Sequence, residues 1–250
     1  MNAPAINMHR QDLPHSALEV LPPAEGLARE MALLSSVSSG ERRAGFLIWR
    51  CSRSLVVPQR LTRRPQYAMA AGRMILDGWP VQVRSTGGDL TPQSPGLINV
   101  ALAFRSRRHK SAIRDSYMTL CRPLIEHLAC QGIEAHCSSV DGAFCDGDYN
   151  LVVEGRKLAG TAQRWRQLEP TVSEQGNEFA VLSHAVLLCD ERLDWLWQAG
   201  NSFYHHCGLT PFIKADRHVS LAQLLPNRKA LLTSTIEQLE ARLTQYVKTL

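Results

Sequence analysis

The sequence predicts an α+β fold, a mixed and largely antiparallel β-sheet flanked by helices. Apolar, β-rich runs come in pairs separated by single helices, rather than in strict β-α-β alternation. The 250 residues, 44% of them apolar, suffice for one sizeable core but not for two large domains. We therefore expect a flexible tail over residues 1–23, which is polar and proline-rich, and a single domain over residues 24–250 that ends in a helix.

The first half of the domain should contain two helices and four strands. A short amphipathic helix is expected at 25–34, and apolar residues at helical spacing predict a second at 66–77, which ends before Gly78. Apolar runs at 46–50 and 54–58, separated by a polar turn, predict a hairpin. The other strands are expected at 80–84 and 96–104.

The second half alternates helices with strands in the same way. A long helix is predicted to stop at Gly132, and a hairpin to turn at Glu154 and Gly155. The remaining elements are a helix at 111–131, a short strand at 133–137, a long strand at 179–189, a helix at 190–206 and a C-terminal helix from about 227.

Composition narrows the class of protein. The net charge of +5 favours an acidic partner, and the basic residues are densest in RLTRR at 60–64 and RSRRHK at 105–110. Aromatic residues do not interleave these clusters as a base-stacking surface requires, so we expect no nucleic-acid binding. The sequence has no apolar run of membrane-spanning length and no secretory leader pattern, so we expect a cytoplasmic protein without a membrane partner.

The seven cysteines are predicted to be reduced thiols, because their number is odd and no C-x-x-C pair occurs. No second ligand pair stands at zinc-site spacing from His136-Cys137 or His205-His206-Cys207, so no metal site is expected.

Cys145 and Lys157 lie on either side of the predicted turn at 154–155. Cys145 sits in a Gly- and Asp-rich loop, where an ammonium favours a thiolate and the flanking Asp146 and Asp148 oppose it. Strand alternation places Lys157, Ala159, Thr161 and Gln163 on one face, and Gly160 permits close backbone approach. From these residues alone, a reactive site and an ordinary hairpin with an inert thiol both remain open.

A second segment, RSTGG at 84–88, follows a predicted strand. Paired glycines let main-chain N–H groups point at a ligand carbonyl or anion, and Arg84 adds charge. Neither G-x-G-x-x-G nor a P-loop is present, so this is no nucleotide fingerprint.

In combination, RSTGG at 84–88, Asn99 and GRKLAGTAQ at 155–163 resemble the biotin and lipoate protein ligase superfamily. The resemblance runs over about residues 25–210 and implies a ligase-like catalytic domain. By the same resemblance the substrate-binding residues are Arg84, Thr86, Gly87, Gly88, Asn99, Gly160, Thr161, Ala162 and Gln163.

Within the superfamily, the chain is most similar to the octanoyl and lipoyl amidotransferase branch, including octanoyltransferases. GAFCDGDYNL at 142–151 matches the segment that carries the cysteine of that branch. Asp89 stands where ATP-dependent ligases usually have a third glycine, and a carboxylate there repels phosphate. The resemblance implies that Cys145 attacks an acyl carbonyl to form a thioester, while Lys157 stabilises the developing negative charge. His184 is interpreted as a satisfied sheet residue rather than a catalytic partner.

The favoured hypothesis is therefore an acyltransferase that moves an octanoyl or lipoyl group onto a lysine of a lipoyl domain. As the resemblance implies, the donor is acyl carrier protein or the glycine cleavage H protein, and no cofactor is expected. Two alternatives stay open: an ATP-dependent lipoate ligase, in which Cys145 is incidental, and a module that binds lipoyl domains or a ligand without catalysis.

Overall fold

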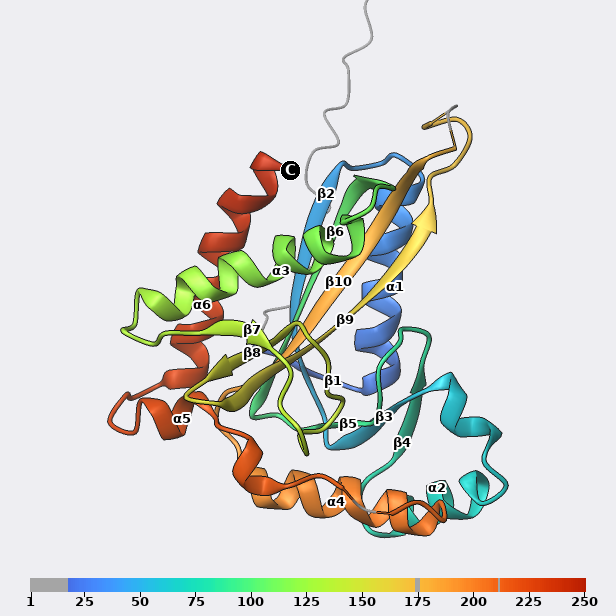
Figure 1. The fold of residues 1–250 in the computed structure, drawn as a ribbon, viewed down its shortest axis with the longest axis vertical. Helices are drawn as coiled ribbons and strands as arrows, with labels where there is room; N and C mark the ends of the chain where they lie inside the picture. Colours follow the sequence, from blue (N-terminus) through green and yellow to red (C-terminus); the bar gives the residue numbers. More distant parts are fainter. Residues whose placement is uncertain (1–17, 174–175, 211) are drawn as a thin grey trace, which may run out of the picture.

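The computed structural model describes residues 18–173, 176–210 and 212–250 of the chain. Its central feature is a seven-stranded sheet in the order β1-β2-β6-β10-β9-β8-β7, antiparallel throughout except between β1 and β2 (Figure 1). The predicted α+β fold is confirmed. The strands are β1 (Val20–Leu21), β2 (Ala44–Cys51), β6 (Leu97–Arg107), β7 (His136–Ser138), β8 (Asn150–Val153), β9 (Arg156–Gln167) and β10 (Glu178–Leu188).

Helices cover both faces of this sheet, because β6 and β10 bury side chains on both sides. The helices α3 (Ala112–Ala129) and α6 (Leu231–Tyr246) pack against one face (Figure 1). The helix α1 (Pro23–Ser38) covers part of the other face, where Leu33 and Leu34 pack on Ala101 and Ala103. The rest of this second face is left for the candidate site.

A smaller sheet completes the fold beside the uncovered part of that face. Its central strand β3 (Ser54–Pro58) pairs in parallel with β4 (Val81–Arg84) and antiparallel with β5 (Thr91–Gln93). The helices α2 (Tyr67–Leu76) and α4 (Leu193–His206) join it in one apolar core. Short segments complete the elements: η1 (Gln59–Arg63), η2 (Ala215–Arg217), α5 (Leu221–Leu224) and η3 (Val247–Thr249).

The predicted hairpin of residues 46–50 and 54–58 is wrong. Both runs are strands, but β2 pairs with β6 in the large sheet and β3 with β4 and β5 in the small one. Every residue of β3 is buried, so this strand is the centre of its own sheet. Long-range pairing on both sides therefore replaces the local pairing that the short turn suggested.

The N-terminal elements also differ from expectation. Within the predicted tail, Val20 and Leu21 pair with β2, and Arg50 Nη1 donates to the carbonyl of Leu18 at 2.8 Å. Residues 1–17 lie outside the described residues. The helix α1 runs to Ser38, one turn beyond the predicted end. In the part of the chain that the structure describes, no helix is both long and apolar enough to span a membrane.

Candidate active site

Cys145 lies in the loop between β7 and β8, and its thiol is held in place from outside that loop. Its Sγ accepts the Asp89 N–H at 2.9 Å and lies 3.6 Å from Arg84 Nη2. The residue has a φ of 42° and only 7% of its surface is exposed. A left-handed non-glycine residue persists only where its surroundings enforce it, which is common at functional sites.

Gly88 makes room for the thiol. With its φ of +94°, a Cβ added there would lie 2.6 Å from Cys145 Sγ and 2.8 Å from Arg84 Nη2. A Cβ on the neighbouring Gly87 would meet no atom within 4 Å. The two glycines that the sequence paired therefore differ, and Gly88 alone contacts the reactive group.

Arg84, at the end of β4, organises the glycine loop from inside. Nη1 donates to Thr91 Oγ1 at 3.0 Å, and Nη2 donates to the carbonyls of Gly87 at 3.0 Å and Asp89 at 2.8 Å. The side chain is buried, and its Nε has no hydrogen-bond partner among the described residues. A guanidinium charge thus sits beside the thiol.

Asp89 does not point its carboxylate into the site. One oxygen accepts the Leu90 N–H at 2.8 Å and the other pairs with Arg60 Nη2 at 3.0 Å. Its backbone N–H, in contrast, serves Cys145. At this position the main chain therefore faces the thiol while the acidic group faces outward.

Lys157 is fully buried beneath the cysteine loop. Its Nζ donates to the carbonyls of Phe144, at 2.5 Å, and Cys145, at 2.9 Å, and lies 4.1 Å from the centroid of the Phe144 ring. Burial lowers the pKa of Lys157 to about 8, although Cys145 and Asp146 act against this. The side chain remains mostly protonated at pH 7 and places a cation directly behind the nucleophile.

The predicted face of Lys157 is wrong. Residues Leu151 and Val152 of β8 face Ala159 and Lys157 of β9, which leaves Leu158 as an extra residue in β9. This bulge reverses the alternation, so Lys157 lies on the same side as Gly160, where an added Cβ would be 3.1 Å from Nζ. The ammonium arm of Lys157 occupies the space that a side chain at position 160 would take.

A small pocket surrounds the thiol. Its open volume is about 10 Å³, which is room for about one water molecule. Its lining residues come from both sheets and the cysteine loop: Arg84, Thr91, Phe144, Cys145, Gly160, Thr161, Ala162, His184 and Val186. Side chains must therefore move before an acyl chain enters.

His184 is a hydrogen-bonded residue of β10, as the sequence was interpreted, and it also faces the site. It lines the Cys145 pocket, and its Nδ1 lies 2.8 Å from Glu30 Oε2. Glu30 of α1 is 2% exposed, and its other oxygen accepts Trp49 Nε1 at 3.0 Å. Glu30 was missed in the sequence, although a carboxylate on the apolar stripe of Leu33 and Leu34 was a detectable signal.

His218 is a second residue that the sequence did not reveal. Its Nε2 accepts the Phe144 N–H at 3.1 Å and its Nδ1 donates to the Lys214 carbonyl at 2.9 Å. Burial, aided by the nearby charge of Lys157, lowers the pKa of His218 to about 4, so the ring is neutral. It lies 74 residues from Phe144 in sequence, and no local signal connects the two.

Three other predicted residues lie away from the thiol. Asn99 is buried in β6, and its amide exchanges two hydrogen bonds with Gln93, at 3.0 and 3.1 Å. Gln163 faces α3 and donates to the Ile113 carbonyl at 3.3 Å. Thr86 is buried in a separate cavity between α1 and β4. Their binding roles stay predictions.

Thr161 lines the pocket, but its hydroxyl is already engaged. Thr161 Oγ1 donates to the Tyr149 carbonyl at 2.8 Å, which ties β9 to the cysteine loop. Ala162 pairs with His184 across β9 and β10 and presents a small side chain to the pocket. The small residues of GRKLAGTAQ thus build the wall behind the nucleophile.

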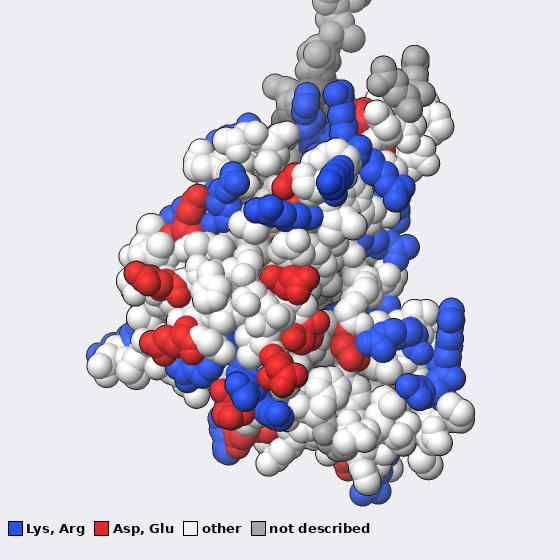
Figure 2. Space-filling model, in the orientation of Figure 1, with Lys and Arg blue, Asp and Glu red and all other residues white. Residues whose placement is uncertain are grey.

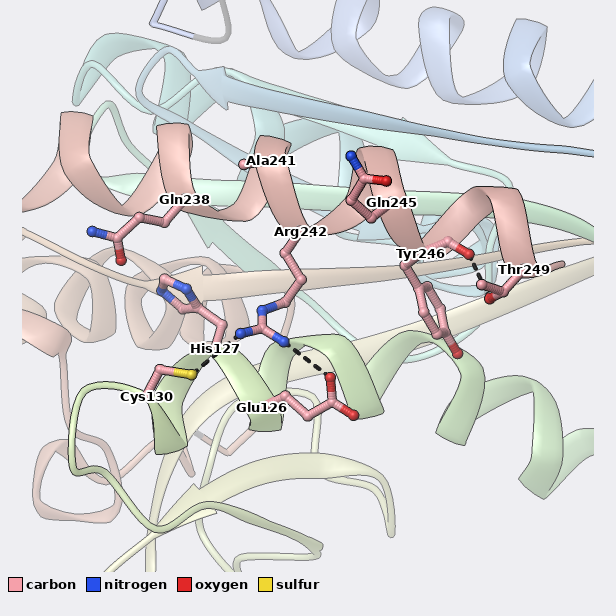
Figure 3. Close-up of a pocket in the computed structure, with 9 residues that line it drawn as sticks. All are labelled: Glu126, His127, Cys130, Gln238, Ala241, Arg242, Gln245, Tyr246 and Thr249. Carbon is pink, nitrogen blue, oxygen red and sulfur yellow. Dashed lines mark hydrogen bonds and ion pairs between the residues drawn. The ribbon is translucent and has the colours of Figure 1, made fainter.

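A larger groove lies between α3 and α6, on the opposite face of the sheet (Figure 3). There Arg242 bridges Glu126, at 3.0 Å, and the exposed Cys130, at 3.3 Å. This thiol lacks the buried cation and the enclosing backbone that Cys145 has. Among the described residues, no cluster of three or more His, Cys, Asp or Glu is arranged to hold a metal ion. We therefore assign the candidate active site to Cys145.

Comparison with known proteins identifies the family of the chain. Residues 22–247 match the family model for the lipoyl protein ligase A/B catalytic domain. An uncharacterised protein of Cupriavidus necator is 34% identical over 84% of this chain and 83% of its own. An octanoyl-[GcvH]:protein N-octanoyltransferase of Kyrpidia tusciae is 33% identical over 90% of this chain and 78% of its own.

Solved structures share the fold. A crystal structure of lipoate-protein ligase A bound with ATP matches 89% of this chain and 79% of its own, with a TM-score of 0.65 and 17% identity. Protein Ta0514 of T. acidophilum, with bound lipoic acid, matches 89% and 80% with a TM-score of 0.64 and 16% identity. The chain belongs to the lipoyl protein ligase A/B catalytic domain family.

Proposed function

We propose that this chain is an acyltransferase that moves an octanoyl or lipoyl group between protein lysines through a thioester on Cys145. The observation that carries the proposal is the setting of that thiol. It accepts a backbone N–H from Asp89, lies beside the buried Arg84, and has the Lys157 ammonium bound to its own carbonyl. A thiolate so placed is stabilised by charge and hydrogen bonding while it faces a pocket.

In the first half-reaction, Cys145 attacks the acyl carbonyl of the donor. An S–C bond forms and the carbonyl oxygen becomes an oxyanion, which the cations of Arg84 and Lys157 stabilise. As the C–N bond to the donor lysine breaks, the proton that the thiol has lost passes to the leaving amine. His184 lines the same pocket and is the group placed to carry that proton.

In the second half-reaction, the neutral amine of the acceptor lysine attacks the thioester. Its proton passes to His184, which lines the pocket, as the C–S bond breaks and the thiolate of Cys145 returns to the Asp89 N–H. One amide is exchanged for another, so the reaction needs no ATP and no cofactor. Splitting the exchange into two steps lets each protein partner visit the site separately.

The names of the relatives support this choice of substrates. Several are octanoyl-[GcvH]:protein N-octanoyltransferases, and one from Listeria monocytogenes is a lipoyl-[GcvH]:protein N-lipoyltransferase. We therefore propose the octanoylated glycine cleavage H protein as donor, ahead of acyl carrier protein, and lipoyl domains as acceptors. Reduced thiols are typical of cytoplasmic proteins, so we propose that the reaction takes place in the cytoplasm.

The test is the intact mass of the protein after incubation with octanoylated H protein, and separately with octanoyl carrier protein, both without ATP. Wild-type protein is expected to gain one octanoyl group that hydroxylamine removes, and Cys145→Ser to gain none. The donor that works identifies the partner.

Three results would contradict the proposal. Acylation of a lipoyl domain only with ATP and free octanoate would indicate a ligase. Binding of lipoyl domains without acyl transfer under either condition would indicate a binding module. Full transfer activity in Cys145→Ala would refute the thioester.

A further inference from the structure

The two basic clusters of the sequence end up in different environments. Figure 2 shows Lys and Arg atoms gathered over the upper end of the large sheet and over the region of η1 and α2 at the lower right. The cluster at 105–110 continues β6, and Arg107 there pairs with Glu178 at 3.0 Å. Arg107 is six residues beyond Ala101, the strand partner of His184, which is about 20 Å along the strand.

The cluster at 60–64 lies against the active site. Arg60 donates to the Gly88 carbonyl at 3.3 Å and pairs with the Asp89 carboxylate at 3.0 Å. The Asp89 N–H in turn holds Cys145 Sγ. A protein that contacts Arg60 thus touches the loop that positions the nucleophile.

Exposed apolar side chains accompany these arginines on α2. Met69, Ile75 and Leu76 are 64%, 58% and 80% exposed, whereas Ala70 and Met74 face the core. Met69, Arg73 and Leu76 follow at i, i+4 and i+7, so they form one stripe along the helix. Exposed apolar side chains rimmed by charge mark protein–protein contact surfaces.

The charge of this region is predominantly positive, although Arg73 pairs with Asp77 at 3.7 Å. Between residues 59 and 77 there are four arginines, at 60, 63, 64 and 73, and one acidic residue, Asp77. Neither Arg63 nor Arg64 has an ion-pair partner within the described residues, and both are exposed. We define the η1–α2 surface as Arg60, Arg63, Arg64, Met69, Arg73, Ile75 and Leu76.

We propose that the η1–α2 surface docks the acidic, partly apolar face of the protein domain that carries the acyl-lysine. The proposal rests on the proposed function. Opposite charge steers the carrier to η1, and the apolar stripe of α2 holds it. The Arg60–Asp89 contact places its lysine next to the Gly88 loop and Cys145.

Two double variants test the surface: Arg63→Glu with Arg64→Glu, and Met69→Gln with Leu76→Gln. Arg108→Glu with Lys110→Glu is the control, because it makes the same charge change at the far cluster. Each protein is assayed with octanoylated H protein and with octanoyl-N-acetylcysteamine, an uncharged thioester that needs no docking.

Both surface variants should lose about tenfold in kcat/KM with octanoylated H protein, through a higher KM. Their acylation by octanoyl-N-acetylcysteamine, and the control with either donor, should stay within twofold of wild type. Surface variants that match wild type with octanoylated H protein overturn the proposal, as does an equal loss in the control.

Binding of H protein without its octanoyl group, measured by calorimetry, separates docking from chemistry. A weaker Kd in the surface variants alone supports the docking site even if Cys145 is never acylated, in which case the proposed function fails by itself. Analytical ultracentrifugation adds one more decisive outcome. If the wild-type protein is a dimer, both surface variants are monomers and the binding of H protein is unchanged, the proposal is overturned. The η1–α2 surface would then be an interface between two copies of this chain.

Discussion

The absence of a side chain at Gly88 makes room for the thiol of Cys145. A Cβ there would lie 2.6 Å from Sγ and would force a residue with side chain into φ +94°. We expect Gly88→Ala to lower the rate of Cys145 acylation at least a hundredfold. Gly87→Ala is the matched control, because a Cβ there meets nothing within 4 Å. Rates from intact-mass time courses that are equal in both variants would contradict this account.

Glu30 and His184 form a buried pair whose charge matters to the pocket. Glu30→Gln keeps the size of the side chain and an oxygen for Trp49 Nε1, but removes the carboxylate from His184 Nδ1. Without it, His184 loses the group that orients its ring. We expect Cys145 acylation to slow about 10- to 100-fold, with little change in the KM of the carrier.

Trp49→Phe provides the control for this variant, since it removes the hydrogen bond to the other Glu30 oxygen and leaves His184 Nδ1 in place. Its acylation rate should stay within a few fold of wild type. Equal acylation rates in the two variants would mean that the Glu30–His184 pair is only a structural contact.

Cys145, Lys157, Arg84 and Gly88 were named from the sequence, and the structure brings all four together. They were named because their motifs resemble those of a known superfamily. The structure adds the physical reason, since Gly88 makes room for the thiol and Lys157 binds the carbonyls of Phe144 and Cys145. Glu30 and His218 were missed because they serve the site from α1 and from the segment after α4. Their partners lie far away in sequence, and only Glu30 left a local signal, as a carboxylate on an apolar helix stripe.

At the scale of elements, Asn99 is a buried polar residue of β6 that joins the two sheets. Its amide pairs with Gln93, which ties β5 of the small sheet to β6 of the large sheet. Asn99→Ala leaves the buried Gln93 amide unpaired, so we expect urea unfolding to show a loss of about 1 to 3 kcal/mol. The double variant with Gln93→Ala should lose less than the sum of the two single variants.

Enzymatic activity separates this structural role from the predicted binding role. If Asn99 only joins the sheets, Cys145 acylation below the unfolding transition should remain within a few fold of wild type in all three variants. A loss of activity that exceeds the loss of folded protein would restore Asn99 as a substrate-binding residue.

Local sequence patterns predicted most of the helices and strands. The predictions that were wrong concern features set by pairing between strands. The helices expected at 66–77 and 111–131 are α2 and α3, and the turn at Glu154 and Gly155 is present. The supposed hairpin failed because β3 found partners in β4 and β5, and the face of Lys157 failed because of the Leu158 bulge. The alternation of residues within one strand shows neither where a bulge occurs nor which sheet the strand joins.

At the scale of the whole molecule, two buried histidines link folding to pH. Burial lowers the pKa of His127 to about 4, with Arg242 and Arg228 adding to the effect, and the pKa of His218 is lowered to the same value. In the unfolded chain both return to about 6.5. Between these values the unfolded state binds protons that the native state excludes, so the free energy of unfolding must fall as the pH falls.

From pH 7 to pH 5, where carboxylates contribute least, each histidine should remove about 2 kcal/mol from the free energy of unfolding. His127→Leu tests this without touching the active site, because His127 lies beside the groove between α3 and α6 (Figure 3). Urea unfolding at pH 7, 6 and 5 measures how far the free energy of unfolding falls with pH. Between pH 7 and pH 5 this fall should be about 2 kcal/mol smaller in His127→Leu than in wild type, whatever the stability of the variant at pH 7. Parallel losses in the two proteins would mean that His127 is protonated in the native state, and acid sensitivity would then have to come from His218 and the loop that it holds under Cys145.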